Sequence, residues 1–184
     1  MAAEDGPPGI LKPTGDRVRF KESGDMGITT AVREDLPRIL EIQKRAFLAE
    51  AVSLGDFSIE PLRQTLESVE NDLATSLILK AVSPDGGILG SVRGKSGEEG
   101  VYVFKLSVDP PAQGRGLGEA LLRSLEEALP ASRYWLFTST KNRPAIALYS
   151  RLGYSAFKER DFSATLRVVY FEKLVPARIP PAPD

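Results

Sequence analysis

The chain has 184 residues, of which 42% are hydrophobic and 27% charged, and its formal net charge is −1. This size and composition suit one domain with a buried core, and the scattered basic residues argue against nucleic acid as the main partner. Cysteine and histidine are both absent, which excludes disulfides, thiolate nucleophiles, Cys/His zinc sites and Ser-His-Asp triads.

The two ends of the chain differ in composition from its middle. Residues 1–16 are rich in proline, glycine and charge, and residues 175–184 contain four prolines. We therefore expect a flexible N-terminal tail, a single domain over residues 17–174 and a proline-rich C-terminal tail. The first residues lack the basic and apolar regions of a signal peptide, and no apolar run reaches membrane-spanning length. These features predict a cytoplasmic protein without a membrane partner.

One strand followed by two helices is predicted for the first half of the domain. Residues 28–32 are rich in β-branched side chains, which favours a strand. Asp35 and Pro37 suit a helix start, and apolar residues follow at helical spacing as far as Phe47. A second helix is predicted to begin near Pro61. Its buried stripe consists of Leu62, Leu66, Val69 and Leu73.

The remaining elements are three strands separated by turns, then alternating helices and strands. The strands are predicted over residues 76–82, 88–93 and 101–108. A helix, a strand, a second helix and a hairpin follow over residues 116–129, 134–138, 143–152 and 154–172. The order β-α-α-β-β-β-α-β-α-β-β predicts a mixed α/β sheet of the α+β kind, antiparallel in its first half, with one parallel βαβ step.

A glycine-rich loop joins the third strand of this meander to the next helix. A helix N-terminus offers unpaired N–H groups and a positive dipole end, and glycine lets a phosphate approach them. The loop therefore predicts a site for an anionic group such as a pyrophosphate, although glycines there could also serve a tight turn alone. A dinucleotide fingerprint fails because Glu119 stands at the third glycine, and a P-loop ending at Gly94-Lys95-Ser96 would need a glycine where Leu89 stands.

Two sequence blocks together resemble the GNAT superfamily of acetyl-CoA-dependent N-acetyltransferases. Gln113, Gly116 and Gly118 fit the pattern Q/R-x-x-G-x-G/A. The second block is Asn142-x-x-Ala145-x-x-Leu148-Tyr149-x-x-Leu152-Gly153-Tyr154. The resemblance covers residues 28–173 and includes the element order of that fold. It implies acetyl-CoA as co-substrate, no metal, and direct attack by a primary amine of an unidentified acceptor in a ternary complex.

The resemblance also implies roles for individual residues. The backbone of Leu106, Ser107 and Val108 would pair with the pantetheine arm as an added strand. The pyrophosphate would lie on the loop and first helical turn formed by Gln113, Gly114, Arg115, Gly116, Leu117, Gly118 and Glu119. Arg115 would add a positive charge beside a phosphate, or would be a solvated loop arginine.

Asn142 would bind the arm of the cofactor, cap the helix that begins at Arg143, or do both. Tyr149 would protonate the departing CoA thiolate, and the alternative is a tyrosine packed in the core. The general base is left open, because the strand over residues 101–108 has no carboxylate. Glu98, Glu99, Glu50 and Asp56 are candidates, and a water held by backbone carbonyls is the alternative.

Two other functional classes compete with the transferase. A non-catalytic acyl-CoA-binding sensor fits the missing strand glutamate, whereas Tyr149 argues against it. A plain nucleotide-binding domain is weakened by the failed fingerprints above. Acceptor identity, acyl-chain length and a homodimer, which some family members form, are not determined by the residues.

Overall fold

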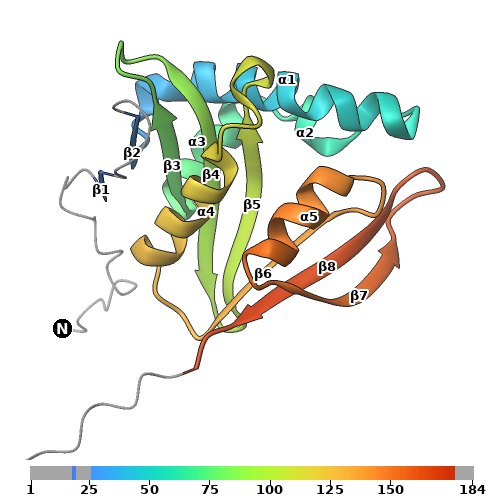
Figure 1. Cartoon of the computed structure of the whole chain (residues 1–184). Coiled ribbons are helices and arrows are strands. Elements are labelled where there is room, and N and C mark those ends of the chain that lie inside the picture. Colours follow the sequence, from blue (N-terminus) through green and yellow to red (C-terminus); the bar gives the residue numbers. More distant parts are fainter. Residues whose placement is uncertain (1–17, 20–25, 177–184) are drawn as a thin grey trace, which may run out of the picture.

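The computed structural model describes residues 18–19 and 26–176 (Figure 1). The predicted tails lie outside this range, apart from Val175 and Pro176. The helices are η1 (Arg33–Asp35), α1 (Leu36–Leu54), α2 (Glu60–Arg63), α3 (Leu66–Thr75), η2 (Pro110–Ala112), α4 (Leu117–Ala128) and α5 (Arg143–Arg151). The strands are β1 (Val18–Arg19), β2 (Gly27–Thr30), β3 (Leu77–Val82), β4 (Ile88–Gly97), β5 (Gly100–Val108), β6 (Arg133–Ser139), β7 (Ser155–Asp161) and β8 (Arg167–Leu174).

All strands belong to one sheet with the order β1-β2-β3-β4-β5-β6-β8-β7. Every neighbouring pair is antiparallel except β5 and β6, which are parallel. This arrangement confirms the predicted mixed sheet, with its single parallel step around the glycine-rich loop. The two-residue strand β1 was not predicted, and it lies just inside the predicted domain.

Strands β5 and β6 pair over only a short distance and then diverge. Val101 pairs with Tyr134 and Tyr102 with Trp135, and the ladder between these two described strands ends there. In Figure 1 the strands separate above this point, with α5 beside the opening. The second half of β5 therefore presents backbone groups that β6 does not occupy.

Helices cover both faces of the sheet (Figure 1). On one face, α4 and α5 pack on a core that includes Leu79, Leu121 and Leu125. On the other, Leu36, Ile39 and Val69 of α1 and α3 pack around Ile78. Ile78 and Leu79 are neighbours on β3 and point to opposite faces, as alternation along a strand requires.

The predicted second helix is wrong as a single element and is divided into α2 and α3. Gln64 follows α2 in an extended conformation, with ψ 134°. Thr65 then caps α3, because its hydroxyl accepts a hydrogen bond from the Ser68 N–H at 3.3 Å. Apolar residues on both sides of the break keep helical spacing, so periodicity alone hides it. The break leaves α2 as a short separate segment beside the opening in the sheet.

A buried polar cluster joins these helices to the sheet. Arg93 of β4 is fully buried and donates to Gln64 Oε1 at 3.0 Å, Asp72 Oδ2 at 2.5 Å and Gln43 Oε1 at 2.7 Å. Gln43 in turn donates to the carbonyl of Pro61 at 2.9 Å. One guanidinium therefore links β4 to α1, to α3 and, through Gln43, to α2.

Candidate active site

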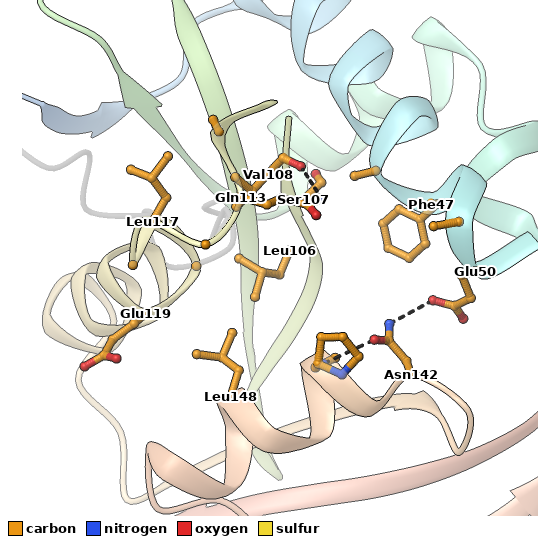
Figure 2. Close-up of a pocket in the computed structure, with 18 of the residues that line it drawn as sticks. Phe47, Glu50, Leu106, Ser107, Val108, Gln113, Leu117, Glu119, Asn142 and Leu148 are labelled. Carbon is orange, nitrogen blue, oxygen red and sulfur yellow. Dashed lines mark hydrogen bonds between the residues drawn. The ribbon is translucent and has the colours of Figure 1, made fainter. Parts of the chain in front are cut away.

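A cavity of about 640 Å³ lies where the C-terminal end of β5 meets α1, α4 and α5 (Figure 2). Its lining includes Ser107, Val108, Gln113, Gly114, Gly116, Leu117, Gly118 and Glu119. We call this space the loop cavity. It brings together most of the residues for which the sequence predicts cofactor contacts.

The floor of the loop cavity is the start of α4. Gly114 and Gly116 have φ values of 76° and 78°, a left-handed conformation that L side chains rarely adopt. Gly116 is the N-cap of α4, and no described side chain caps this helix. Its first-turn N–H groups are therefore free to bind an anion that enters the cavity.

Glycine is required at position 118 for a different reason than at positions 114 and 116. A Cβ atom at this position would stand 3.2 Å from Leu148 Cδ2 of α5, which is closer than an ordinary contact. Gly118 thus permits close packing of α4 against α5, and both helices line the loop cavity.

The end of β5 forms one wall of the loop cavity. Leu106, Ser107 and Val108 all line it. The Gln113 side chain donates to the carbonyl of Val108 at 3.0 Å (Figure 2). This bond holds the loop against the strand end, so the strand edge and the helix N-terminus face one space.

Two predicted residues lie at or beyond the margin of this space. Arg115 is exposed and is absent from the lining of the cavity, which favours the interpretation as a solvated loop arginine. Glu119 lines the cavity and bonds Arg123 at 3.0 Å. The hydrogen bond from Arg123 lowers the pKa of Glu119, so this carboxylate is charged at neutral pH.

A second cavity, of about 310 Å³, is lined by residues of β5 and β6 at the opening between these strands. Its walls are mainly aromatic and aliphatic. They include Tyr102, Phe104, Phe137, Tyr149, Phe162 and Leu166. We call this space the aromatic cavity. Tyr102 stacks on Phe104 with ring centroids 5.0 Å apart, and Phe137 stacks on Phe162 at 5.5 Å.

The two cavities share a wall, and this wall carries polar groups. Phe47, Glu50, Leu106, Asn142 and Ala145 line both spaces. Asn142 caps α5 by accepting from the Ala145 N–H at 3.2 Å, and it donates to Glu50 Oε2 at 3.1 Å. Figure 2 shows Glu50 and Phe47 on α1, facing Asn142 across the gap. The capping role predicted for Asn142 is confirmed.

Tyr149 belongs to the core and to the aromatic cavity at once. It is only 8% exposed, and its ring lies 5.9 Å from that of Phe171 and 6.1 Å from that of Tyr154. It also lines the aromatic cavity. Burial and then the charge of Glu50 raise the pKa of Tyr149 above its usual value. The phenol is therefore a proton donor, not a phenolate, at neutral pH.

The four candidate carboxylates separate clearly in space. Glu98 and Glu99 are exposed in the turn between β4 and β5, and Asp56 bonds Ser58 and Thr165. None of these three lines either cavity. Glu50 lines both, and burial raises its pKa, while the hydrogen bond from Asn142 and the charge of Lys105 oppose this rise. Glu50 lies within α1.

Lys105 and Glu60 are polar residues of the aromatic cavity that the sequence analysis missed. Both line it, and they form an ion pair with each other. Nothing local marks either residue, because the pair joins β5 to α2 across 45 positions of the chain. The aromatic walls of this cavity were missed too, because they also come from separate segments of the chain. Alternation along β5 and β6 was the available signal, since it places Tyr102, Phe104 and Phe137 on one face of the sheet.

The end of β5 and the N-terminus of α4, which has no side-chain cap, face one cavity. An aromatic cavity adjoins it at the gap between β5 and β6. These features define a class of α/β protein with two adjoining cavities. Residues 36–154 match the family model for the acetyltransferase (GNAT) family. The chain therefore belongs to the GNAT acetyltransferase family, as the two sequence blocks indicate.

Curated relatives agree with this membership. Mycothiol acetyltransferase of Salinispora tropica is 32% identical over 125 residues, which are 63% of this chain and 40% of the relative. Mycothiol acetyltransferase of Thermomonospora curvata is 30% identical over 82% of this chain and 48% of the relative. Ribosomal protein bS18 alanine N-acetyltransferase of Escherichia coli K12 is 38% identical over 38% of this chain and 44% of the relative. The chain thus spans less than half the length of these relatives.

Solved structures share the fold. The PaiA N-acetyltransferase of Thermoplasma acidophilum, in complex with coenzyme A, has a TM-score of 0.68 and 18% identity, over 82% of this chain and 99% of the other. The ribosomal protein S18 alanine N-acetyltransferase of Escherichia coli has a TM-score of 0.67 and 19% identity, over 84% of this chain and 99% of the other. The predicted fold is confirmed.

The described ranges, residues 18–19 and 26–176, contain no group of three or more Asp, Glu, His or Cys side chains that could hold a metal ion. None of their helices is long and apolar enough to cross a membrane.

Proposed function

We propose that this chain transfers the acetyl group of acetyl-CoA to a primary amine. The observation that carries the proposal is the wall shared by the two cavities. A thioester held in the loop cavity and an amine held in the aromatic cavity would meet at Glu50, Leu106 and Asn142. Holding both reactants in one geometry supplies much of the rate of a bimolecular step.

The loop cavity would bind the acetyl-CoA. The free N–H groups of residues 114–119 would hold the pyrophosphate at the start of α4. The unpaired edge of Leu106, Ser107 and Val108 would bond the amides of the pantetheine arm, since β6 leaves this edge open. Asn142 would contact the arm near the thioester.

Glu50 is our candidate for the general base, and Tyr149 for the general acid. The amine nitrogen would attack the thioester carbonyl carbon while its proton passes to Glu50, directly or through a water. The C–S bond then breaks, and the Tyr149 hydroxyl gives its proton to the CoA thiolate. A carboxylate of raised pKa on the shared wall, and a protonated phenol that lines the adjoining aromatic cavity, support these two roles.

A turnover assay tests the proposal. The protein is incubated with acetyl-CoA and a panel of amines, amino acids and peptides, and released CoA is measured with a thiol-reactive dye. The chain has no cysteine, so it adds no background signal. We expect thiol release that needs both acetyl-CoA and an amine, and about 10²-fold slower release in Tyr149→Phe.

Tyr154→Phe is the matched control for the tyrosine. Tyr154 is also buried, but its hydroxyl donates to Glu126 Oε1 at 2.8 Å and lines neither cavity. Its removal should leave turnover near the wild-type rate. Binding of acetyl-CoA without turnover across the panel would favour the sensor instead, and no binding of any CoA species would overturn the proposal.

A further inference from the structure

The aromatic cavity contains a cation in an unusual setting. The Lys105 side chain is only 13% exposed, and its partner Glu60 is 65% exposed. Glu60 lies on α2, the short segment that the break at Gln64 separates from α3. An ion pair with so exposed a partner is weakened by solvent. The cation therefore faces the cavity while its counter-ion is largely in water.

The backbone at Lys105 is also special. Lys105 has φ 53°, and it is the only non-glycine residue of the described chain with a positive φ. The register between β4 and β5 shifts at this point, between Ser91 and Arg93. A bulge of this kind redirects a side chain and ends regular pairing, and a positive φ costs a lysine conformational energy. Structural needs of the sheet alone would be met better by glycine.

The charge of the Lys105 ammonium is only partly compensated by its surroundings, so a second anion could bind to it. Burial lowers the pKa of Lys105 to about 8, and the charge of Glu50 opposes this change. The cavity therefore stabilises the ammonium less than water does. A carboxylate that entered the cavity would form a charge-assisted hydrogen bond shielded from solvent, which is stronger than the exposed pair.

Lys105 and Glu50 together define where an acceptor would lie. Glu50 is on the wall that the two cavities share. Lys105 lines the aromatic cavity and does not line the loop cavity. Both groups line the same cavity of about 310 Å³. An amine at Glu50 and a carboxylate at Lys105 would thus belong to one small molecule. The stacked rings of Tyr102, Phe104, Phe137 and Phe162 suit an apolar or aromatic body.

We propose that the acceptor is an amino acid with an apolar or aromatic side chain, and that Lys105 binds its carboxylate in exchange for Glu60. This inference rests on the proposed function, because it names the substrate class of that site. The amine would then face the thioester at the shared wall, and Lys105 would act as a specificity residue.

The test compares free amino acids with their amides. Initial rates give kcat/KM for phenylalanine, leucine and tryptophan and for the three corresponding amides, with acetyl-CoA saturating. We expect wild type to prefer the acids about 10-fold or more, the effect of one charged hydrogen bond. Lys105→Met should bring the ratio of acid to amide close to one, and Lys105→Arg should retain the preference.

Glu60→Gln gives a prediction of opposite sign. It removes the competing counter-ion, so the ratio of acid to amide should rise. Lys80→Met is the matched control, because Lys80 is similarly buried at 16% exposure and pairs with Asp35 at 2.5 Å, outside both cavities. Its ratio should equal that of wild type.

Failure of this inference can be told apart from failure of the proposed function. Acetylation of amines with no preference for the acid, a ratio unchanged in Lys105→Met, or a ratio lowered in Glu60→Gln would overturn the inference alone. If no amine is acetylated, the proposed function fails. Calorimetric titration with N-acetylphenylalanine and with its amide then tests Lys105 without turnover, and equal affinities would overturn the inference there too.

Discussion

Glu50 combines a half-buried position with access to both cavities, which is what a general base in this site needs. Burial raises its pKa, and Asn142 donates to one of its oxygens at 3.1 Å. This hydrogen bond favours the ionised form that accepts a proton. Burial and the hydrogen bond thus have opposite effects on the pKa of Glu50, so the carboxylate can still act as a base. The same hydrogen bond holds the side chain at the shared wall.

The Glu50→Gln variant tests this role through pH dependence. A base works only when ionised, so wild-type activity should fall as pH drops through the raised pKa of Glu50. We expect Glu50→Gln to lose this acid limb and about 10²-fold in kcat/KM for the amine, with the affinity for acetyl-CoA retained. The measurement is the pH profile of kcat/KM. Glu98→Gln, in an exposed turn, is the control, and a variant profile identical to wild type would contradict the role.

One buried arginine adds polar contacts to the apolar packing that holds helices α1, α2 and α3 against the sheet. Arg93 bonds Gln43, Gln64 and Asp72, and Gln43 holds the carbonyl of Pro61. Glu60 and Pro61 of α2 both line the aromatic cavity. The position of this cavity wall thus depends on a polar cluster on a different strand.

Arg93→Met should cost about 3–5 kcal/mol of the free energy of unfolding, because it removes the cation that pairs with Asp72 and the donor to the buried Gln43 Oε1. Urea unfolding followed by circular dichroism measures this loss. Arg123→Met, which removes an exposed pair with Glu119 on α4, should cost less than about 1 kcal/mol. Equal costs for the two variants would show that the cluster does not hold the helices.

At the scale of the whole molecule, the loop cavity lies between elements from both halves of the sheet. Its lining comes from α1, β5, α4 and α5. A ligand seated there contacts parts of the chain that separate on unfolding, so binding and folding are coupled. The homodimer and the cytoplasmic location stay predictions.

Acetyl-CoA should therefore raise the melting temperature. At a concentration of 100 Kd, a ligand that binds only the folded state contributes about 2.7 kcal/mol, or about 5 to 10 °C for a chain of this size. Differential scanning fluorimetry measures the shift, with NAD and ATP as controls. A shift with NAD or ATP and none with a CoA species would favour the alternative of a plain nucleotide-binding domain.

The order of the elements, the loop at α4 and the cap at Asn142 could be predicted because their signals are local. Helical periodicity, a glycine before a helix and an asparagine at its start act over a few residues. The same local signals cannot reveal a break between two helices when the apolar residues on both sides keep helical spacing. The break at Gln64 between α2 and α3 was therefore not predicted.

The sequence by itself thus determined the class of fold, the family and most of the loop cavity. Only the tertiary structure decided that β5 and β6 diverge after Tyr102, that Asn142 holds Glu50 across 92 positions, and that Lys105 meets Glu60. These features arise from contacts between distant segments. Their partners are chosen by how helices and strands pack against one another, and no spacing along the chain encodes that choice.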